Sequence, residues 1–163
     1  MKHLFSPWRS DYINLKQPTG CFLCRAMKQR KDKANLILFR GAQSFVIMNR
    51  FPYNNGHLMI APYRHTGDIT KLTADEAGEM FALLQQVTGI LKREMKPDAF
   101  NVGMNLGRVA GAGLAEHLHV HVVPRWNGDT NFMPVLTDAK VISEALDTTW
   151  RRLRKQLVVS SKQ

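Results

Sequence analysis

Three histidines alternate with apolar residues in the stretch AEHLHVHVVPRWNGD at 115–129. Residues two apart in a β-strand lie on the same face, so His117, His119 and His121 would point to one side of a sheet. The chain holds six histidines in 163 residues, and three at alternating positions would arise by chance in roughly 1% of such sequences. The pattern therefore predicts a strand with one core face and one face available for chemistry.

Such a row of imidazoles suits two kinds of chemistry. Alternating histidines can ligate zinc, although a catalytic zinc commonly takes a further histidine or a carboxylate as its third ligand. Alternatively, one histidine is a nucleophile while its neighbours hold an anionic substrate. A glycine-rich stretch at 107–116 runs directly into the histidines, and Gly107, Gly111 and Gly113 would let backbone N–H groups approach a phosphate closely. This loop favours the nucleophile over a zinc ion held by all three histidines.

The chain is strongly basic, with a formal charge of +10 at pH 7. A surface of this kind attracts polyanions without selecting among them. Much of the excess charge lies in 25–33 and 150–156, which read as helix faces. These segments are interpreted either as solvated surface or as phosphate- or nucleic-acid-binding segments, and the surface interpretation is favoured because no readout motif accompanies the charge.

Length and composition predict one soluble domain over 1–163, with tails of about the first ten and last six residues. The chain is 44% hydrophobic, which is enough for one substantial core. No apolar run of 18 residues occurs, and the N-terminal stretch MKHLFSPWRSDYI lacks the apolar run of a secretion signal. Cys21 and Cys24 are too close for a disulfide framework and are typical of reduced thiols or half a zinc site. We therefore expect a cytoplasmic protein.

The histidine segment must be placed by a sheet, and an antiparallel meander is predicted before it. Short apolar segments at Ile37–Phe39, Phe45–Met48 and His57–Ala61 are separated by turn residues. A further strand is expected at Phe100–Leu106, before the glycine-rich loop. The fold class is therefore α+β, an antiparallel sheet of about five strands with helices packed on one face.

Two helices are predicted. The first begins after Thr73, which with Glu76 forms a capping box, and ends before Pro97. Its expected core positions follow a 3.6-residue period: Ala77, Met80, Phe81, Leu84, Val87 and Leu91. The second is expected near Val141–Leu157. The residues that it offers to the core are Val141, Ala145, Trp150 and Leu153.

The histidine segment and its flanks resemble a known family. HLHVHVV resembles the His-x-His-x-His-x-x signature of the histidine triad (HIT) superfamily of nucleotide hydrolases and transferases. SFVIMNRFPYNNGHLMIAP looks like the family's nucleoside-binding hairpin, with Asn49 and His57 spaced as in the fragile-histidine-triad branch. The stretch GMNLGRVAGAGLAEHLHVHVVPRWNGDTNF resembles a bacterial branch that contains diadenosine tetraphosphate phosphorylases. The resemblance covers roughly 20–135 and implies that 1–163 is a single HIT domain, with its core at about 20–135 and a C-terminal helix at about 140–158.

The resemblance implies covalent nucleotidyl transfer. His119 would attack the α-phosphorus of a nucleotide and form a nucleotidyl-histidine intermediate, because an imidazole with an ordinary pKa near 6.5 keeps a neutral ring nitrogen at pH 7. His121 and the loop amides would stabilise the transition state, and Asn105 would contact the same phosphate. Substrate binding would also involve residues of the hairpin: Asn49 at the ribose, His57, and Phe45 with Ile47 or Met48 as walls for the base.

The resemblance also implies a structural zinc and a homodimer. Cys21 and Cys24 would close a tetrahedral site with His65 and His117, as in the galactose-1-phosphate uridylyltransferase branch. The alternative is two reduced thiols that pack at the start of a helix. The helix that begins after Thr73 is the candidate dimer interface. No organic cofactor and no membrane partner are expected.

The expected substrates are dinucleoside polyphosphates such as diadenosine tetraphosphate. Inorganic phosphate as acceptor would make the protein a phosphorylase, which the branch resemblance favours slightly, and water would make it a hydrolase. Two alternatives stay open: phosphoramidate hydrolysis by the same histidine, and a non-catalytic module that binds nucleotides or nucleic acid, which the charge suggests.

Overall fold

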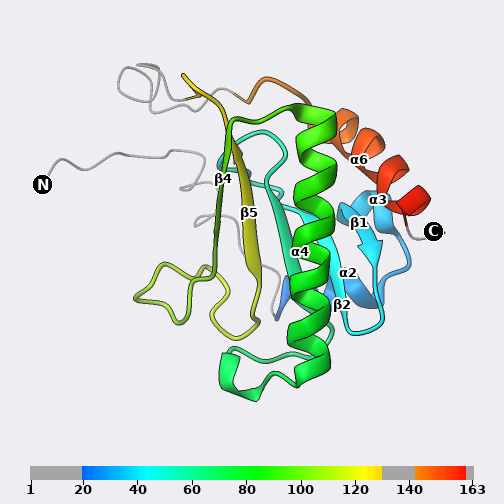
Figure 1. The fold of residues 1–163 in the computed structure, drawn as a ribbon. Coiled ribbons are helices and arrows are strands. Elements are labelled where there is room, and N and C mark those ends of the chain that lie inside the picture. Colours follow the sequence, from blue (N-terminus) through cyan, green and yellow to red (C-terminus); the bar gives the residue numbers. More distant parts are fainter. Residues whose placement is uncertain (1–19, 130–141, 161–163) are drawn as a thin grey trace, which may run out of the picture.

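A five-stranded antiparallel sheet forms the centre of the molecule (Figure 1). The computed structural model describes residues 20–129 and 142–160. The strands are β1 (Ile37–Arg40), β2 (Ser44–Met48), β3 (Leu58–Pro62), β4 (Ala99–Gly103) and β5 (Val120–Arg125), in the order β1-β2-β3-β5-β4. The predicted α+β class and the sheet of about five strands are confirmed. The strand expected at Phe100–Leu106 ends earlier, at Gly103.

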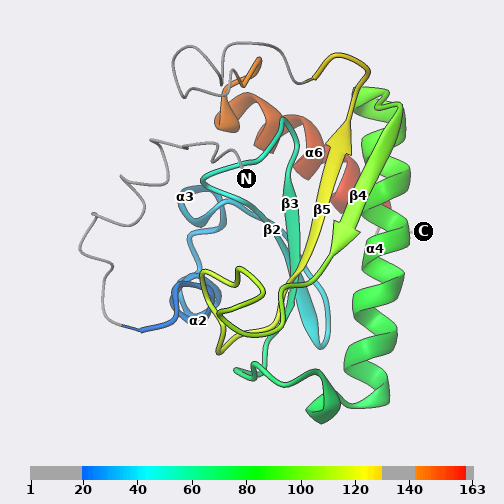
Figure 2. The ribbon, with the colours of Figure 1, turned by 90° about the vertical axis from the view of Figure 1, so that its left-hand side faces the viewer.

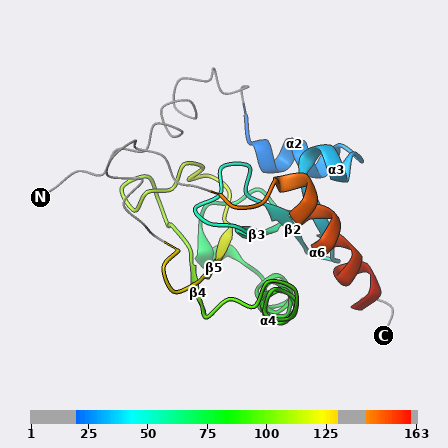
Figure 3. The same ribbon diagram turned by 90° about the horizontal axis from the view of Figure 1, so that it is seen from above.

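The helices lie on both sides of this sheet. They are α2 (Phe22–Lys28), α3 (Asp32–Asn35), α4 (Ala74–Met95) and α6 (Leu146–Ser160), with a 3-10 turn η1 at Ile69–Lys71. Figures 2 and 3 show the sheet between α2 on one side and α4 on the other. The expectation that all helices pack on one face was therefore wrong. No helix in the described part of the chain is long and apolar enough to cross a membrane.

Each side of the sheet packs against its own hydrophobic core. Successive residues of β2 contribute side chains to the two cores in turn. Val46 and Met48 join the core under α4 and α6, whereas Phe45 and Ile47 join the core under α2. This alternation follows from the two-residue period of a strand. Met59 of β3 belongs to the α2 side and pairs directly with His121. Since directly paired residues project to the same face, His121 lies on the α2 side of the sheet.

Helix α4 begins as predicted. The Thr73 hydroxyl accepts a hydrogen bond from the Glu76 N–H, and the Glu76 carboxylate accepts one from the Thr73 N–H, which completes the capping box. The core face was only partly predicted: Met80, Val87 and Leu91 are buried. Other positions differ from the prediction: Ala77 and Phe81 are exposed, Leu84 is half-buried, and Leu83 and Ile90 are buried in their place.

Helix α6 packs against α4 and β1. It begins at Leu146, five residues after the predicted start. Leu153 is fully buried and Trp150 packs against the same core, as expected, but Ala145 is exposed. Val141 and most of the predicted tails lie outside the described residues.

Candidate active site

The histidine segment enters β5 only at its end. His121 is in the strand, whereas His117 and His119 precede it. The extended segment before the strand is held by the end of β3 and the chain that follows it: Leu118 N–H donates to Thr66 O (2.7 Å), and His117 Nε2 donates to Pro62 O (2.9 Å). The sequence thus predicted the histidine row but placed its strand too early, because side chains and a neighbouring loop replace the sheet hydrogen bonds at 117–119.

The orientation of the His119 ring fixes which of its two nitrogens carries the proton. Its Nδ1 lies 2.8 Å from the backbone oxygen of His117. A carbonyl oxygen only accepts hydrogen bonds, so Nδ1 carries the proton and donates. The neutral ring therefore keeps its lone pair on Nε2, away from that carbonyl. This is the tautomer that a nucleophilic histidine needs.

His57 and His121 form a pair with an equally defined proton arrangement. The Tyr53 N–H donates to His57 Nδ1 (3.1 Å), so His57 Nε2 carries the proton and donates to His121 Nδ1 (2.9 Å). His121 Nε2 is then left as an N–H donor. The rings of His119 and His121 are 4.8 Å apart, so a ring that keeps a lone pair on Nε2 lies next to a ring that carries an N–H donor.

Burial keeps these imidazoles neutral. It lowers the pKa of His57 to about 3, with His121 and His119 as further causes, and the pKa of His121 to about 4, with His119 as the further cause. Burial also lowers the pKa of His119, against the bond to the His117 carbonyl, which raises it. At pH 7 the site thus presents neutral rings, with donors and lone pairs at defined atoms.

The residues that were predicted to bind the nucleoside fall into two groups. Asn49 lies beside the histidines, with its amide nitrogen 3.4 Å from His57 Nδ1. Phe45 is on the correct face but is fully buried and stacked on Tyr63. Met48 is in the α4 core, on the opposite face of the sheet from His121. The structure therefore brings Asn49 and His57 to the site and leaves Phe45 and Met48 in the core.

The glycine-rich loop lies on the same side of the sheet as α2 (Figure 2), and its Leu114 packs against the α2 core. Gly107 and Gly111 have φ angles of +87° and +91°, which favour glycine. Asn105 donates to Gly111 O (3.4 Å) and so braces the turn. Gly113 is exposed. No direct hydrogen bond joins this loop to the histidine rings among the contacts that the structure describes.

Cys21, Cys24, His65 and His117 converge, and one ligand atom from each lies within 4.8 Å of the others. His117 Nδ1 is 3.2 Å from Cys21 Sγ, 3.5 Å from Cys24 Sγ and 3.3 Å from His65 Nδ1. Ligand atoms around a tetrahedral zinc lie about 3.3–3.8 Å apart, given bond lengths near 2.0–2.3 Å. His117 Nε2 donates to Pro62 O, which leaves the Nδ1 lone pair for a metal. The donor set and spacing fit a metal ion.

The sequence did not single out three residues that support His57. Tyr53 supplies the N–H described above, and its ring lies 4.7 Å from that of His57. The next residue, Asn54, is buried and donates to Asp129 Oδ2 (2.8 Å) and to Pro124 O (3.0 Å). Asp129 also binds Arg125 through both carboxylate oxygens. The contacts of Asn54 join residues 70 and 75 positions apart, so no local pattern indicates them.

Comparison with solved structures identifies the fold as that of histidine triad proteins. A Zn-bound histidine triad family protein from Mycobacterium smegmatis superposes with a TM-score of 0.69 at 23% identity, over 88% of this chain and 98% of that one. A diadenosine triphosphate hydrolase from Plasmodium falciparum gives a TM-score of 0.61 at 14% identity, over 79% and 78% of the two chains.

Sequence comparison shows the family. The HIT domain model matches residues 30–128, and the chain belongs to the HIT family. An AP-4-A phosphorylase from Mycobacterium tuberculosis is 39% identical over 161 residues, which span 94% of this chain and 83% of the relative. A bis(5'-adenosyl)-triphosphatase from Saccharomyces cerevisiae is 31% identical over 91 residues, 55% of this chain and 44% of the relative. The predicted family is thereby confirmed.

Proposed function

We propose that this protein is a nucleotidyl transferase that cleaves dinucleoside polyphosphates such as diadenosine tetraphosphate and passes the nucleotide to inorganic phosphate. The observation that carries the proposal is the tautomer of His119, whose Nδ1–H donates to the His117 carbonyl and leaves a lone pair on Nε2. The names of the two relatives support the substrate class. The mycobacterial relative, which matches most of this chain, supports phosphate as the acceptor.

The proposed reaction has two displacements at one phosphorus atom. His119 Nε2 attacks the α-phosphorus of diadenosine tetraphosphate, an N–P bond forms, the bond to the bridging oxygen breaks, and ATP leaves. An oxygen of inorganic phosphate then attacks the same phosphorus, the N–P bond breaks, and ADP is released. The two steps together convert diadenosine tetraphosphate and phosphate into ADP and ATP, and His119 regains its lone pair.

The groups around His119 would orient the substrate and stabilise the charge of the transferring phosphoryl group. His121 Nε2–H is a donor next to the nucleophile, and such preorganised donors stabilise the charge of a transferring phosphoryl group. Asn49 would hold the ribose. The amides of the glycine-rich loop, braced by Asn105, would approach the phosphates from the same side of the sheet. The His57–His121 hydrogen bond keeps the donor of His121 directed away from His57.

The cluster of Cys21, Cys24, His65 and His117 is proposed to hold zinc. Two thiolates and two imidazoles are a common structural zinc set, and a Zn-bound protein with the same fold supports the choice of metal. When bound, zinc would fix the ring of His117 and supply no step of the reaction. His117 would then be a positioning residue, since its carbonyl oxygen orients His119.

Three further properties belong to the proposal. The whole chain would form a single domain, in the cytoplasm, where the two cysteines stay reduced. It would form a homodimer, as the resemblance to the family implies. The exposed edge strand β4 and the exposed Phe81 of α4 supply surface for a second copy. The nucleic-acid alternative is weakened because Arg151, Arg152 and Arg154 of the basic C-terminal segment pair with acidic side chains.

Product analysis tests the proposal. Purified protein is incubated with diadenosine tetraphosphate with and without inorganic phosphate, and the nucleotides are separated by chromatography. We expect ADP and ATP only when phosphate is present. AMP and ATP without phosphate would replace the phosphorylase with a hydrolase, and no cleavage in either condition would overturn the enzyme proposal.

Replacement of the nucleophile separates catalysis from binding. His119→Ala is expected to abolish turnover while nucleotide affinity stays within a few-fold of the wild type, because the ring contributes to bond making more than to ground-state binding. Lys92→Ala, on an exposed position of α4, serves as the control. Equal loss of turnover and affinity would indicate a binding module whose fold depends on His119.

A further inference from the structure

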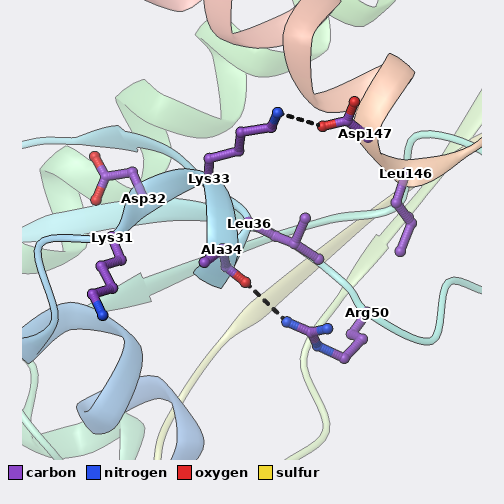
Figure 4. A pocket seen from close by; sticks show the side chains of 8 residues that line it. All are labelled: Lys31, Asp32, Lys33, Ala34, Leu36, Arg50, Leu146 and Asp147. Atoms are coloured by element: carbon purple, nitrogen blue, oxygen red, sulfur yellow. Dashed lines mark hydrogen bonds and ion pairs between the residues drawn. The ribbon is translucent and has the colours of Figure 1, made fainter.

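Two features adjoin the residues proposed to act on the nucleotide. One is a hollow of about 660 Å³ beside Arg50 (Figure 4). Because Arg50 follows Asn49 directly, this hollow belongs with the nucleotide site already proposed. The other is the cluster of cysteines and histidines that fits a metal ion. Its two thiols take no part in the proposed reaction, and thiols also carry redox chemistry.

We infer that Cys21 and Cys24 are a reversible oxidation site, which closes to a disulfide in the presence of a peroxide, releases the bound zinc and lowers turnover at His119. The inference rests on the proposed zinc, and its effect on turnover rests on the proposed function. The cluster thereby gains a regulatory role in addition to its structural one.

The two thiols are close enough to be joined. Cys21 directly precedes α2 and Cys24 lies in the first turn of this helix, where the Cys24 N–H donates to Cys21 Sγ (3.4 Å). The ligand atoms of the cluster, which include both sulfur atoms, lie within 4.8 Å of one another. A disulfide brings two sulfur atoms to about 2.05 Å, and Cys-x-x-Cys pairs with this spacing form reversible disulfides in oxidoreductases.

The cluster is open to solvent on one side. His117 is fully buried, whereas His65 is exposed and both cysteines are half-buried. The Sγ atom of Cys24 lies 3.3 Å from Nδ1 of the exposed His65. A molecule as small as hydrogen peroxide can therefore approach the sulfur atoms from the His65 side. This exposure distinguishes the pair from the inert cysteines of a closed core.

The oxidation balances as a two-electron reaction with hydrogen peroxide. A thiol that ligates a metal is held as the thiolate, which is the nucleophilic form. The Cys24 thiolate attacks one peroxide oxygen, an S–O bond forms, the O–O bond breaks, and the leaving hydroxide takes up a proton. The Cys21 thiolate then attacks the Cys24 sulfur, an S–S bond forms, the S–O bond breaks, and the second hydroxide takes up a proton. Two thiolates, hydrogen peroxide and two protons thus give one disulfide and two water molecules.

Oxidation of the pair loosens His117. A disulfide no longer supplies the thiolate ligands, and the two histidines that remain are too few for a structural zinc site. His117 then keeps the hydrogen bond from Nε2 to Pro62 O and loses its second anchor, at Nδ1. The backbone oxygen of His117 accepts the hydrogen bond that sets the tautomer of His119. A less firmly held His117 therefore misplaces the proposed nucleophile.

Peroxide treatment of the zinc-bound protein tests the inference. The protein is purified under reducing conditions, treated with a small molar excess of hydrogen peroxide and freed of peroxide with catalase. Released zinc is measured with a chromogenic chelator, free thiols by alkylation and mass spectrometry, and turnover with diadenosine tetraphosphate. We expect both thiols to be lost within one chain, zinc to be released in proportion, and turnover to fall about ten-fold. Dithiothreitol with added zinc should reverse all three changes.

Two controls separate the cysteines from the eight methionines of the chain. Reversal by dithiothreitol is the first, because methionine sulfoxide needs dedicated reductases. The second is Met27→Leu, which removes the methionine of α2 at nearly constant volume. This variant should lose and regain zinc, thiols and turnover as the wild type does.

Retention of zinc and of both free thiols at a peroxide dose that oxidises methionines would overturn the inference, and so would a disulfide that joins two chains. Disulfide formation and zinc release without a change in turnover would overturn the regulatory role and leave the proposed function standing. Failure of the untreated protein to cleave diadenosine tetraphosphate would instead overturn the proposed function, while the thiol and zinc measurements would still decide whether the pair is an oxidation site.

Discussion

The histidine segment is supported at its two ends by different means. At the His117 end, two cysteines and His65 surround the ring at metal-ligand spacing. At the His121 end, the support is a buried neutral imidazole, His57, which is itself held by the 53–57 loop. One end depends on a metal-competent cluster, and the other depends on hydrogen bonds and on the absence of charge.

Each support is also connected by hydrogen bonds to a helix or strand of the fold. His65 follows Arg64, whose guanidinium donates to both carboxylate oxygens of Glu76 in the capping box of α4, and these bonds lower the pKa of Glu76 to about 2. At the other end, Asn54 ties the loop before His57 to Asp129, just beyond β5. His119, the proposed nucleophile, thus lies between two supports that should fail under different conditions: loss of metal for one, and acidification for the other.

Disruption of the cluster of cysteines and histidines at the His117 end should have the largest effect on stability and turnover. Cys24→Ser takes one ligand from the cluster, and we expect loss of bound zinc together with roughly 3–5 kcal/mol of stability, or a fall in Tm of about 10–15 °C. Turnover should fall at least about ten-fold because His117 no longer holds its carbonyl in place. Zinc content by mass spectrometry, thermal unfolding and kcat measure the three effects.

The matched control for that variant is Lys28→Ala, on an exposed position of the same helix. It should keep the zinc, the Tm and the turnover of the wild type. A wild-type protein that is isolated without zinc and is fully stable and active would contradict the structural role of the metal.

Acidification should weaken the other support. The pKa of His57 is about 3 in the folded protein, below its ordinary value of 6.5, because of burial and then the neighbouring histidines. The unfolded chain therefore binds the proton first as the pH falls. The stabilisation is complete above pH 6.5 and is lost progressively between pH 6.5 and pH 3. At pH 5 the titration of His57 has lowered the free energy of unfolding by about 2 kcal/mol.

The measurement is the free energy of unfolding in urea at pH 7.5 and pH 5.0, for the wild type and for His57→Gln. The wild type should lose about 2 kcal/mol more than the variant over this interval, because glutamine does not titrate. The difference between the two proteins removes the contribution of the metal ligands, which also take up protons in acid. Equal losses would show that His57 is not a source of acid sensitivity.

The sequence predicted the parts of this arrangement that are local or periodic. The capping box at Thr73 and the three strands of the meander depend on neighbouring residues, and the structure contains both. The separation of Phe45 and Met48 onto opposite faces also follows from the two-residue period of a strand, since they are three positions apart. Of the two alternatives for the second wall of the base, Ile47 shares the face of Phe45 and Met48 does not.

Other features depend on contacts that a local pattern does not contain. Phe81 fits the 3.6-residue period of α4 but is 62% exposed, because the sheet covers a face that is centred on Leu83, Val87 and Ile90 instead. The start of β5 depends on hydrogen bonds to the end of β3 and to the chain that follows it. The support of His57 by Asn54 and Asp129 is formed only when the loop and the end of β5 meet.

The loop support can also be weakened without removing an imidazole. Asn54→Ala removes two hydrogen bonds from a buried amide, one of them to the ionised Asp129, and should cost about 2 kcal/mol of stability. The metal cluster is untouched, so zinc content should stay at the wild-type value. Turnover should fall a few-fold, because the Tyr53 N–H that sets the tautomer of His57 belongs to the same loop. The neighbouring Asn55→Ala is the matched control. Within the described part of the chain the Asn55 amide makes one long contact, of 3.4 Å, to Ser143, so this variant should change stability by less than about 0.5 kcal/mol. If the two asparagine variants were equally stable and equally active, the connection from Asp129 through the loop to His57 would not support the site, and the metal side alone would position the nucleophile.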